Sequence, residues 1–340
     1  MRARPDTAAE LRHAEGKLLA WDTAPARIPC ALQPRDTALL AALGRYRFLT
    51  TVQIADVWWP GCALQVVRRR LTRLFEAGYV ERFRPQTIRG SYQWIYCLAR
   101  DGHRAAQQAG ELPAEWKFTA RREQIFDYRY VIHDLRLNDW VIAYRALAGD
   151  RLLGWDGPDD SRLEPPAIEP YQLDRGTFGG FVSGLAPGPP RPLAPDGALE
   201  LVGQRGLAYV LLEYDRTRRV DKNFDKFRRY DRFLNTWSTN SRHADRGQAH
   251  VLFLCEHRPH LERFLAAADH QLTGRQFVQR EDGTPQEHFG ARNFILFALA
   301  GDIYAGELTV YSVPPLPPGH PERGDQVAPQ RRYLPARAAE

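Results

Sequence analysis

The stretch PDGALELVGQRGLAYVLLEYD, residues 195–215, decides the fold that we expect for the second half of the chain. Its two arms, 198–202 and 207–212, consist largely of apolar residues with a high preference for strands. Gly203 and Gly206 bound the short segment between the arms. Apolar runs separated by a short glycine-containing segment are typical of a β-hairpin, and we predict one here.

The open end of this hairpin is acidic. Asp196 precedes the first strand, and Glu213 and Asp215 close the second. Because a hairpin brings its open ends together, we expect the three carboxylates to lie near one point at the edge of a sheet. Hard divalent cations such as Mg²⁺ or Mn²⁺ take one or two carboxylates together with waters and substrate phosphates. The sequence therefore predicts a metal site that activates water for attack on phosphorus.

Two lysines follow the hairpin on a helix that we predict over 220–235. The chain has only four lysines among its 47 Lys and Arg residues, and two of them are Lys222 and Lys226. An ammonium group near the carboxylates would stabilise negative charge at a reacting phosphate. The candidate catalytic residues are therefore the three carboxylates with Lys226, or else Lys222. The alternative interpretation is an acidic hairpin end followed by an amphipathic helix with solvated charges.

The remaining pattern of the second half alternates between strands and helices. We predict a mixed sheet flanked by helices over residues 119–312, an α+β or α/β arrangement, with a Pro- and Gly-rich irregular insertion at 157–194. The other elements that we expect are a long helix over 121–147, a short strand at 151–155, buried strands at 249–255 and 293–299, and a helix at 259–269. The pair His257 and His260 lacks an evident third ligand, so we expect no metal there.

Residues 34–110 predict a separate domain. Three helices at about 37–44, 52–59 and 62–77 precede two strands at 79–84 and 92–98 and a further helix at 101–108, with Asp36 as the cap of the first helix. This order is that of a winged helix-turn-helix, in which the third helix is the recognition helix.

The third helix and the wing carry the basic residues that point to double-stranded DNA. Arginines there can pair with phosphates and reach guanine edges in the major groove. The candidate DNA-binding residues are Gln65, Arg68, Arg69, Thr72 and Arg73 on the helix and Arg82, Arg84 and Arg89 on the wing. A solvated helix face, or a winged helix used for protein contacts, are the alternatives.

Bulk properties agree with a polyanion partner. The chain has 340 residues, a formal net charge of +6 and a pI near 9.2, and a basic excess favours nucleic acid. No apolar run of 18 residues and no signal-peptide pattern is present, so we expect a cytoplasmic protein without a membrane partner. Residues 1–33 are expected to form a flexible arm and residues 313–340 a disordered tail.

These motifs, in this order, resemble the replication-relaxation family of plasmids and other mobile elements. The stretches that carry the resemblance are LTTVQIA (49–55), RRLTRLFEAG (69–78), YCLARDG (96–102), HDLRLND (133–139), PD (195–196) and LEYDRT (212–217), with Lys226 and Tyr230. The resemblance implies a winged helix joined to a nuclease-like domain of the PD-(D/E)xK type, acting on mobile-element DNA. The chain departs from that pattern at Asp215, where the superfamily has lysine.

Two functions follow. In the first, a DNA-binding protein acts in replication, relaxation or transfer of a mobile element, and cleaves or nicks DNA with Mg²⁺ or Mn²⁺ at Asp196 and Glu213. Asp215 is then a further ligand or a supporting carboxylate. In the second, the protein is a non-enzymatic transcriptional regulator or replication initiator, in which an inactive nuclease-like domain serves dimerisation or DNA wrapping. A homodimer is compatible with both.

Overall fold

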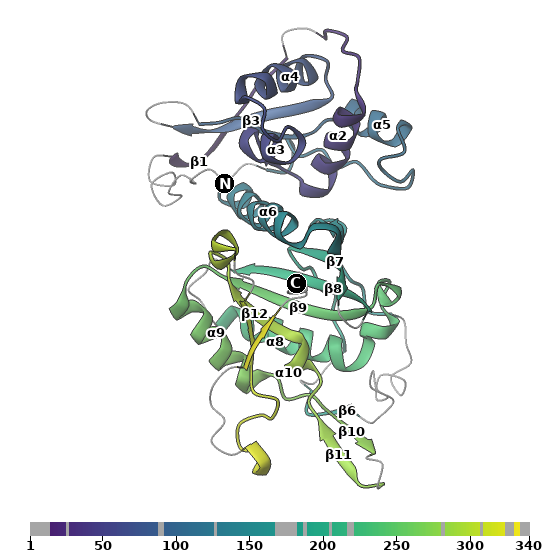
Figure 1. Ribbon diagram of the computed structural model, residues 1–340, viewed down its shortest axis with the longest axis vertical. Helices are drawn as coiled ribbons and strands as arrows, with labels where there is room; N and C mark the ends of the chain where they lie inside the picture. The colour runs from purple at the N-terminus through teal and green to yellow at the C-terminus, as the bar shows by residue number, and fades with distance from the viewer. Residues whose placement is uncertain are drawn as a thin grey trace. The chain divides into compact units, whose positions relative to one another are not determined.

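The computed structural model describes two compact units, residues 1–142 and 143–340 (Figure 1). Each unit is described by itself. The described residues are 14–24, 27–87, 92–125, 128–166, 182–185, 189–203, 206–215, 221–279, 283–306, 309–323 and 330–333. Among the helices of these segments, none is long and apolar enough to cross a bilayer.

The N-terminal unit combines helices with one antiparallel sheet in the strand order β1-β3-β4-β2. Its elements are β1 (Ala14–Trp21), α2 (Pro34–Tyr46), β2 (Leu49–Thr50), α3 (Thr51–Trp58), α4 (Leu64–Glu76), β3 (Val80–Thr87), β4 (Ile95–Leu98), α5 (Arg100–Gln108) and the first part of α6 (Tyr128–Ala148). The order of three helices, two strands and a helix agrees with the order that we expected over 34–110.

Local capping explains where the first helices begin. At α3, Thr50 and Gln53 form a reciprocal capping box, in which each side chain accepts a hydrogen bond from the other residue's backbone N–H. The expectation that Asp36 caps the first helix is wrong. The helix begins at Pro34, whose fixed φ suits the first helical position, and the Asp36 carboxylate accepts from the Gln33 backbone N–H instead.

Pairing across the chain changes two boundaries of the N-terminal unit. The expected flexible arm over 1–33 is wrong for Ala14–Trp21, which forms β1 and pairs with β3. The helix expected over 121–147 begins only at Tyr128. Strand pairing of this kind depends on a partner some sixty residues away, so local composition does not reveal it.

The division between the units falls within α6 and not in the connector at 111–118. The first turns of α6 pack on the N-terminal sheet, and their core consists of Tyr128, Val131, Ile132 and Leu135 with Phe48, Phe83, Ile95 and Cys97. Polar contacts add to it, since the Asn138 amide donates to the backbone carbonyls of Tyr46 and Phe48 at 2.9 and 2.7 Å. These contacts explain why the boundary expected at about residue 119 lies further along the chain.

The C-terminal unit contains a seven-stranded mixed sheet in the order β14-β13-β12-β9-β8-β7-β5. Strands β8, β9 and β12 are parallel to one another and the other neighbours are antiparallel. The elements are β5 (Leu152–Asp156), β6 (Val182–Ser183), β7 (Gly197–Gly203), β8 (Gly206–Asp215), α8 (Asp221–Arg232), a π-helical turn (Phe233–Trp237), β9 (Gln248–Cys255), α9 (Arg258–Gln271), β10 (Arg275–Gln279), β11 (Pro285–His288), α10 (Ala291–Phe294), β12 (Ile295–Leu299), β13 (Thr309–Ser312) and β14 (Gln330–Tyr333). Short 3₁₀ turns are Gly149–Arg151, Ser238–Asn240, Ala244–Arg246, Asp302–Ala305 and Pro321–Arg323.

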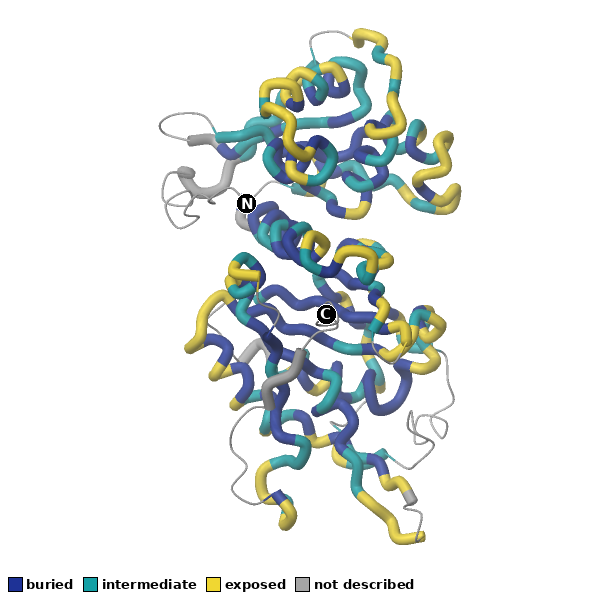
Figure 2. Tube along the Cα trace, viewed as in Figure 1, coloured by how far each residue is buried: buried dark blue, intermediate teal, exposed yellow. Residues whose placement is uncertain are grey.

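The mixed sheet flanked by helices is therefore confirmed, and the hairpin of residues 195–215 lies within it as β7 and β8. Figure 2 shows the central strands buried along their length. One core joins this sheet to α8 and α9, through residues that include Phe227, Tyr230, Phe253, Phe264 and Phe297. Phe227 makes edge-on ring contacts with Phe253 and Phe264 at centroid distances of 5.0 and 5.6 Å, a favoured aromatic geometry.

Two expectations of irregular chain are corrected in this unit. Part of the insertion at 157–194 is ordered by pairing: Val182–Ser183 forms β6 beside β10, and Leu163 bridges Leu193. Within the tail expected to be disordered over 313–340, Gln330–Tyr333 forms β14 on β13. In both cases a distant strand supplies the hydrogen bonds that the local sequence lacks.

The start of β7 depends on a glycine, which gives a stability prediction. A Cβ at Gly197 would lie 2.1 Å from a ring carbon of the buried Trp155, so Gly197→Ala forces the ring or the strand to shift. We expect the free energy of unfolding to fall by about 1–3 kcal/mol, measured by urea denaturation. Gly301→Ala is the control because no heavy atom lies within 4 Å of its added Cβ. Equal stability of both variants would contradict this packing.

Candidate functional site

Asp196 and Glu213 lie at the open end of the β7–β8 hairpin. The register of the hairpin ends with Gly197 opposite Leu212, so Asp196 immediately precedes the paired strand and Glu213 follows Leu212 on β8. The charge of Asp196 acts on Glu213, which places the two carboxylates near each other. The Asp196 backbone N–H donates to the Leu212 carbonyl at 2.9 Å, and its carboxylate accepts from the Tyr214 N–H at 2.8 Å. The structure thus brings together two of the three predicted carboxylates.

Glu213 is a buried carboxylate with two partners from α8. Its side chain is 3% exposed. Lys226 Nζ forms an ion pair with Glu213 Oε2, and the Tyr230 hydroxyl donates to Oε1 at 2.6 Å. The lysine that the sequence could place only on the following helix therefore contacts the acidic cluster, with a side chain 39% exposed.

Helical spacing explains why α8 delivers both partners. Lys226 and Tyr230 are four residues apart and share one face of the helix. Phe227, between them, is fully buried in the core against the sheet and fixes the rotation of α8. The packing of Phe227 in the core therefore orients Lys226 and Tyr230 toward β8.

The electrostatics of the cluster reflect burial and like charge. The pKa of Glu213 is raised to about 7, mainly by burial and also by the charge of Asp196, although the charge of Lys226 and the hydrogen bonds from Lys226 and Tyr230 lower it. Burial lowers the pKa of Lys226, but the charges of Glu213, Asp196 and Asp215 outweigh it and the net shift is upward. Lys226 therefore carries its positive charge at neutral pH.

Asp215 extends the same row of carboxylates. It lies two residues beyond Glu213 on β8, and strand alternation puts both on one face of the sheet. Its Oδ1 lies 3.8 Å from Nε2 of His260, in the first turn of α9. The backbone of Lys222, the other candidate lysine, belongs to α8. The position of its side chain is not among those that the structure describes.

The described segments contain no group of three or more His, Cys, Asp or Glu side chains arranged to hold a metal ion. The expected three-carboxylate set is thus not assembled as one cluster. The close pair is Asp196 and Glu213, and both carboxylate oxygens of Glu213 already accept hydrogen bonds.

The candidate DNA-binding residues of α4 are surface residues. Gln65, Arg68, Arg69 and Arg73 are exposed and Thr72 is half-buried. The buried side of α4 consists of Val67, Leu71, Leu74 and Phe75. Arg70 is engaged elsewhere, with its guanidinium on the fully buried Asp36 carboxylate. The helix therefore separates a packed side from an arginine-rich exposed side.

The wing arginines differ from one another. The Arg82 guanidinium donates to Asp22 at 2.7 Å and lies over the rings of Phe75 and Trp94. The Arg84 guanidinium lies 4.7 Å from the centroid of the Trp94 ring. Arg89 lies outside the described residues. The contacts of Arg82 hold the chain after β1, and α4, to β3, and this structural role was not apparent from the sequence.

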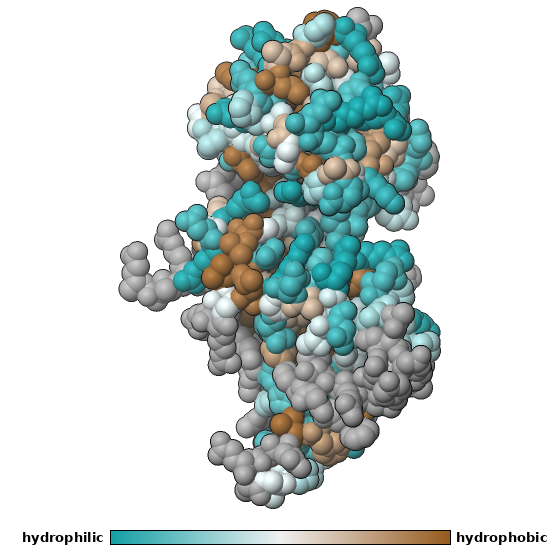
Figure 3. Space-filling model, turned by 90° about the vertical axis from the view of Figure 1, so that its right-hand side faces the viewer, coloured by the Kyte–Doolittle hydropathy of each residue, from teal (hydrophilic) through white to brown (hydrophobic). Residues whose placement is uncertain are grey.

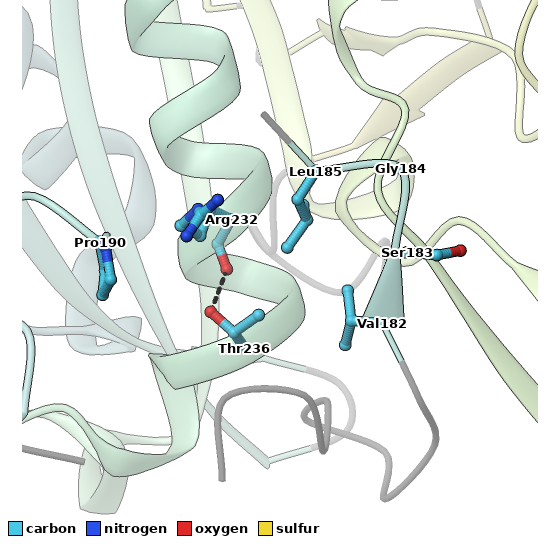
Figure 4. A pocket seen from close by; sticks show the side chains of 7 residues that line it. All are labelled: Val182, Ser183, Gly184, Leu185, Pro190, Arg232 and Thr236. Atoms are coloured by element: carbon cyan, nitrogen blue, oxygen red, sulfur yellow. Dashed lines mark hydrogen bonds between the residues drawn. The ribbon is translucent and has the colours of Figure 1, made fainter. Parts of the chain in front are cut away.

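The C-terminal unit contains a small cavity that is not lined by Asp196, Glu213 or Lys226. Its volume is about 200 Å³ and its lining consists of Val182, Ser183, Gly184, Leu185, Pro190, Arg232 and Thr236 (Figure 4). The dashed line in Figure 4 is the bond from the Thr236 hydroxyl to the Arg232 carbonyl, 2.7 Å long. None of the candidate catalytic residues lines it. The face of the molecule in Figure 3 is mainly hydrophilic, with hydrophobic residues in separate groups.

Sequence reasoning missed the polar role of Tyr230. An aromatic residue at helical spacing indicates a core position, and the Tyr230 ring is indeed buried in the core. The hydroxyl, however, reaches Glu213. The spacing of four residues from Lys226 could have indicated this contact. A side chain on the same helix face as Lys226 points toward the same carboxylate, that of Glu213.

The fold and the site define a two-unit protein whose mixed-sheet unit presents an acidic pair with a lysine. The chain belongs to the replication-relaxation family. The sequence model of this family matches residues 40–246, which is more than half of the chain. A comparison with curated proteins found no match. Among solved structures, the restriction endonuclease FokI is 13% identical with a TM-score of 0.21; the alignment covers 69% of this chain and 40% of FokI.

The ion pair of Lys226 gives a prediction about Glu213. Lys226→Met removes the positive charge that lowers the pKa of Glu213, so this pKa should rise above about 7. The measurement is a ¹³C NMR titration of protein labelled at glutamate carboxyl groups. Lys117→Met, which removes an exposed lysine of the N-terminal unit, should leave the titration unchanged. An unchanged Glu213 pKa in Lys226→Met would show that the two side chains do not meet in solution.

Proposed function

We propose that this protein binds double-stranded DNA of a plasmid or mobile element and nicks or cleaves it during replication, relaxation or transfer. The observation that carries the proposal is the buried Glu213, with Asp196 near it and Lys226 on its carboxylate. Membership of the replication-relaxation family supports the setting. In this proposal the N-terminal unit is a winged helix, and the C-terminal unit is a nuclease-like domain of the PD-(D/E)xK type.

The carboxylates fit a hard divalent cation. Asp196 and Glu213 provide oxygen donors of the kind that Mg²⁺ and Mn²⁺ prefer. Burial and the charge of Asp196 raise the pKa of Glu213. Two carboxylates close together are electrostatically unfavourable, and a bound cation would relieve this repulsion. When bound, the cation supplies a more acidic water and stabilises charge on phosphate oxygens. Asp196 and Glu213 would hold it, with Asp215 as a supporting carboxylate.

The protein's own groups have separate roles in this mechanism. Lys226, charged at neutral pH and partly exposed, would stabilise negative charge on the scissile phosphate. Tyr230 fixes one oxygen of Glu213 and so orients the other. The lysine thus acts from a helix, whereas the family pattern places it on the strand where this chain has Asp215.

The exposed arginines of α4 would bring the site to DNA. Arg68, Arg69 and Arg73 project from the side of the helix that is not packed, and arginine is the side chain best suited to phosphates and to guanine edges. In a winged helix this element enters the major groove. Arg84 and Arg89 of the wing would contact the backbone, while Arg82 is held by Asp22.

A second candidate function is a non-enzymatic regulator or initiator that retains an inactive nuclease-like domain. The observation that favours it is that both carboxylate oxygens of Glu213 already accept hydrogen bonds from α8. The described residues also contain no group of three or more potential metal ligands. In that case the Lys226–Glu213 pair serves the packing of α8, and DNA binding alone remains.

Conversion of supercoiled plasmid separates the two functions. We expect nicked or linear product with Mg²⁺ or Mn²⁺ and none with EDTA. Asp196→Ala, Glu213→Ala and Lys226→Ala should each lower the rate by about 100-fold or more. Asp225→Ala, which removes an exposed carboxylate of α8, should cut like the wild type. DNA binding without metal-dependent cleavage would leave the second function.

DNA binding by α4 is tested by fluorescence anisotropy over a range of salt concentrations. Replacing Arg68, Arg69 and Arg73 by alanine should weaken binding at least about tenfold, and each lost phosphate contact should reduce the salt dependence, −dlog K/dlog[salt], by about 1. Arg104→Ala, an exposed arginine of α5 paired with Asp101, is the control. An unchanged affinity in the triple variant would exclude α4 as the DNA-binding element.

A further inference from the structure

His260 is a buried imidazole with one unsatisfied nitrogen. It lies in the first turn of α9 and is 1% exposed. Among the described residues, its Nε2 has no hydrogen-bond partner. A buried polar atom without a partner costs free energy, so this nitrogen requires an explanation that packing alone does not give.

Nε2 of His260 faces Asp215. The distance to Asp215 Oδ1 is 3.8 Å, longer than the 2.7–3.2 Å of a formed N–H···O bond. A small rotation of the carboxylate would close this gap, and hydrogen bonds in catalytic sites are often long until a ligand is bound.

The ring itself is held in place, so that the carboxylate is the partner that adjusts. The His260 ring makes an edge-on contact with Phe264 at a centroid distance of 4.4 Å, and the centroid of the His257 ring lies 5.7 Å away. Burial lowers the pKa of His260, which keeps the ring neutral with a single N–H. The imidazole is therefore a fixed, uncharged donor if the proton is on Nε2.

Asp215 belongs to the same electrostatic environment as the candidate site. It shares a face of β8 with Glu213, and its charge contributes to the raised pKa of Lys226. Asp215 stands where the family pattern has its lysine. A second carboxylate there adds negative charge beside Glu213. His260 on α9 lies beside Asp215, with Nε2 3.8 Å from Oδ1, whereas Lys226 on α8 contacts Glu213 directly.

We propose that His260 is a positioning residue of this site: its Nε2–H donates to Asp215 Oδ1 and holds that carboxylate toward Lys226 and Glu213. The inference rests on the proposed function for its role, but the contact itself does not depend on cleavage. In this arrangement α8 supplies Lys226 and Tyr230 to Glu213, and α9 supplies His260 to Asp215, two residues further along β8. The departure from the lysine pattern is then a rearrangement of the site in which Asp215 acquires a partner of its own.

The contact is tested by ¹⁵N NMR of histidine-labelled protein, which reports which ring nitrogen carries the proton. The His260 signals are assigned by their loss in His260→Gln. We expect the neutral ring with its proton on Nε2, and a shift of that nitrogen in Asp215→Ala. Glu256→Ala is the matched control, because Glu256 is another carboxylate near the ring, and it should leave the signal in place. A proton on Nδ1, or no response to Asp215→Ala, would overturn the proposal.

The positioning role is tested by Mn²⁺ binding, followed by electron paramagnetic resonance without DNA. Glutamine keeps a donor near the place of Nε2, whereas asparagine keeps one near Nδ1 only. We expect His260→Asn to weaken Mn²⁺ binding about tenfold and His260→Gln to stay within about twofold of the wild type. His243→Gln, a buried histidine of another segment, controls for loss of an imidazole. Equal effects of the asparagine and glutamine variants would refute positioning through Nε2.

The two outcomes that concern the proposed function remain separate. Wild-type protein that binds Mn²⁺ but leaves plasmid intact would refute cleavage, while the asparagine and glutamine variants still decide the role of His260. Wild-type protein that binds no Mn²⁺ would refute the metal site and with it the positioning role. The NMR experiment would then decide only whether His260 and Asp215 meet.

Discussion

The burial of Glu213 at the edge of the sheet is the constraint on which the C-terminal unit's chemistry depends. An ionised carboxylate taken out of water is costly unless charge and hydrogen bonds compensate for it. Lys226 and Tyr230 provide both from α8. This compensation is incomplete, because burial and the nearby charge of Asp196 keep the pKa of Glu213 raised. A proton on Glu213, or the cation of the proposed function, would relieve this charge.

This constraint also explains the position of the site within the fold. Glu213 and Asp215 end β8, a central strand that runs parallel to β9. The carboxyl ends of parallel strands are where the following helices begin, so α8 and α9 can both direct polar side chains to one edge. The remainder of each helix is packed by aromatic rings such as Phe227 and Phe264. The rigid core therefore sets the positions of groups that are themselves partly exposed.

The N-terminal unit separates packing from charge in a different manner. Arg70 and Arg82 are bound to Asp36 and Asp22, and these ion pairs help to hold the helices and β3 together. The arginines on the outer side of α4 remain exposed. A count of arginines in the sequence does not distinguish these two groups. Burial of the acidic partner distinguishes the paired arginines from the exposed ones, because a fully buried carboxylate such as Asp36 requires a cation beside it.

The sequence by itself determined the elements whose patterns are local. The hairpin of 195–215 followed from two apolar runs and a glycine-bounded turn, and the buried strand 249–255 from a continuous apolar run, and both are present. The exposed side of α4 followed from helical periodicity. The nearness of Asp196 and Glu213 followed from the hairpin, since a hairpin brings its two open ends together.

Only the tertiary structure decided what depends on distant partners. It selected Lys226 as the partner of Glu213, revealed the hydroxyl of Tyr230 as its second donor, and placed His260 beside Asp215. It also turned two stretches that appear irregular into the strands β1 and β14. The physical reason is the same in each case: the contact joins elements whose relative rotation is set by core packing, and no local pattern encodes that rotation.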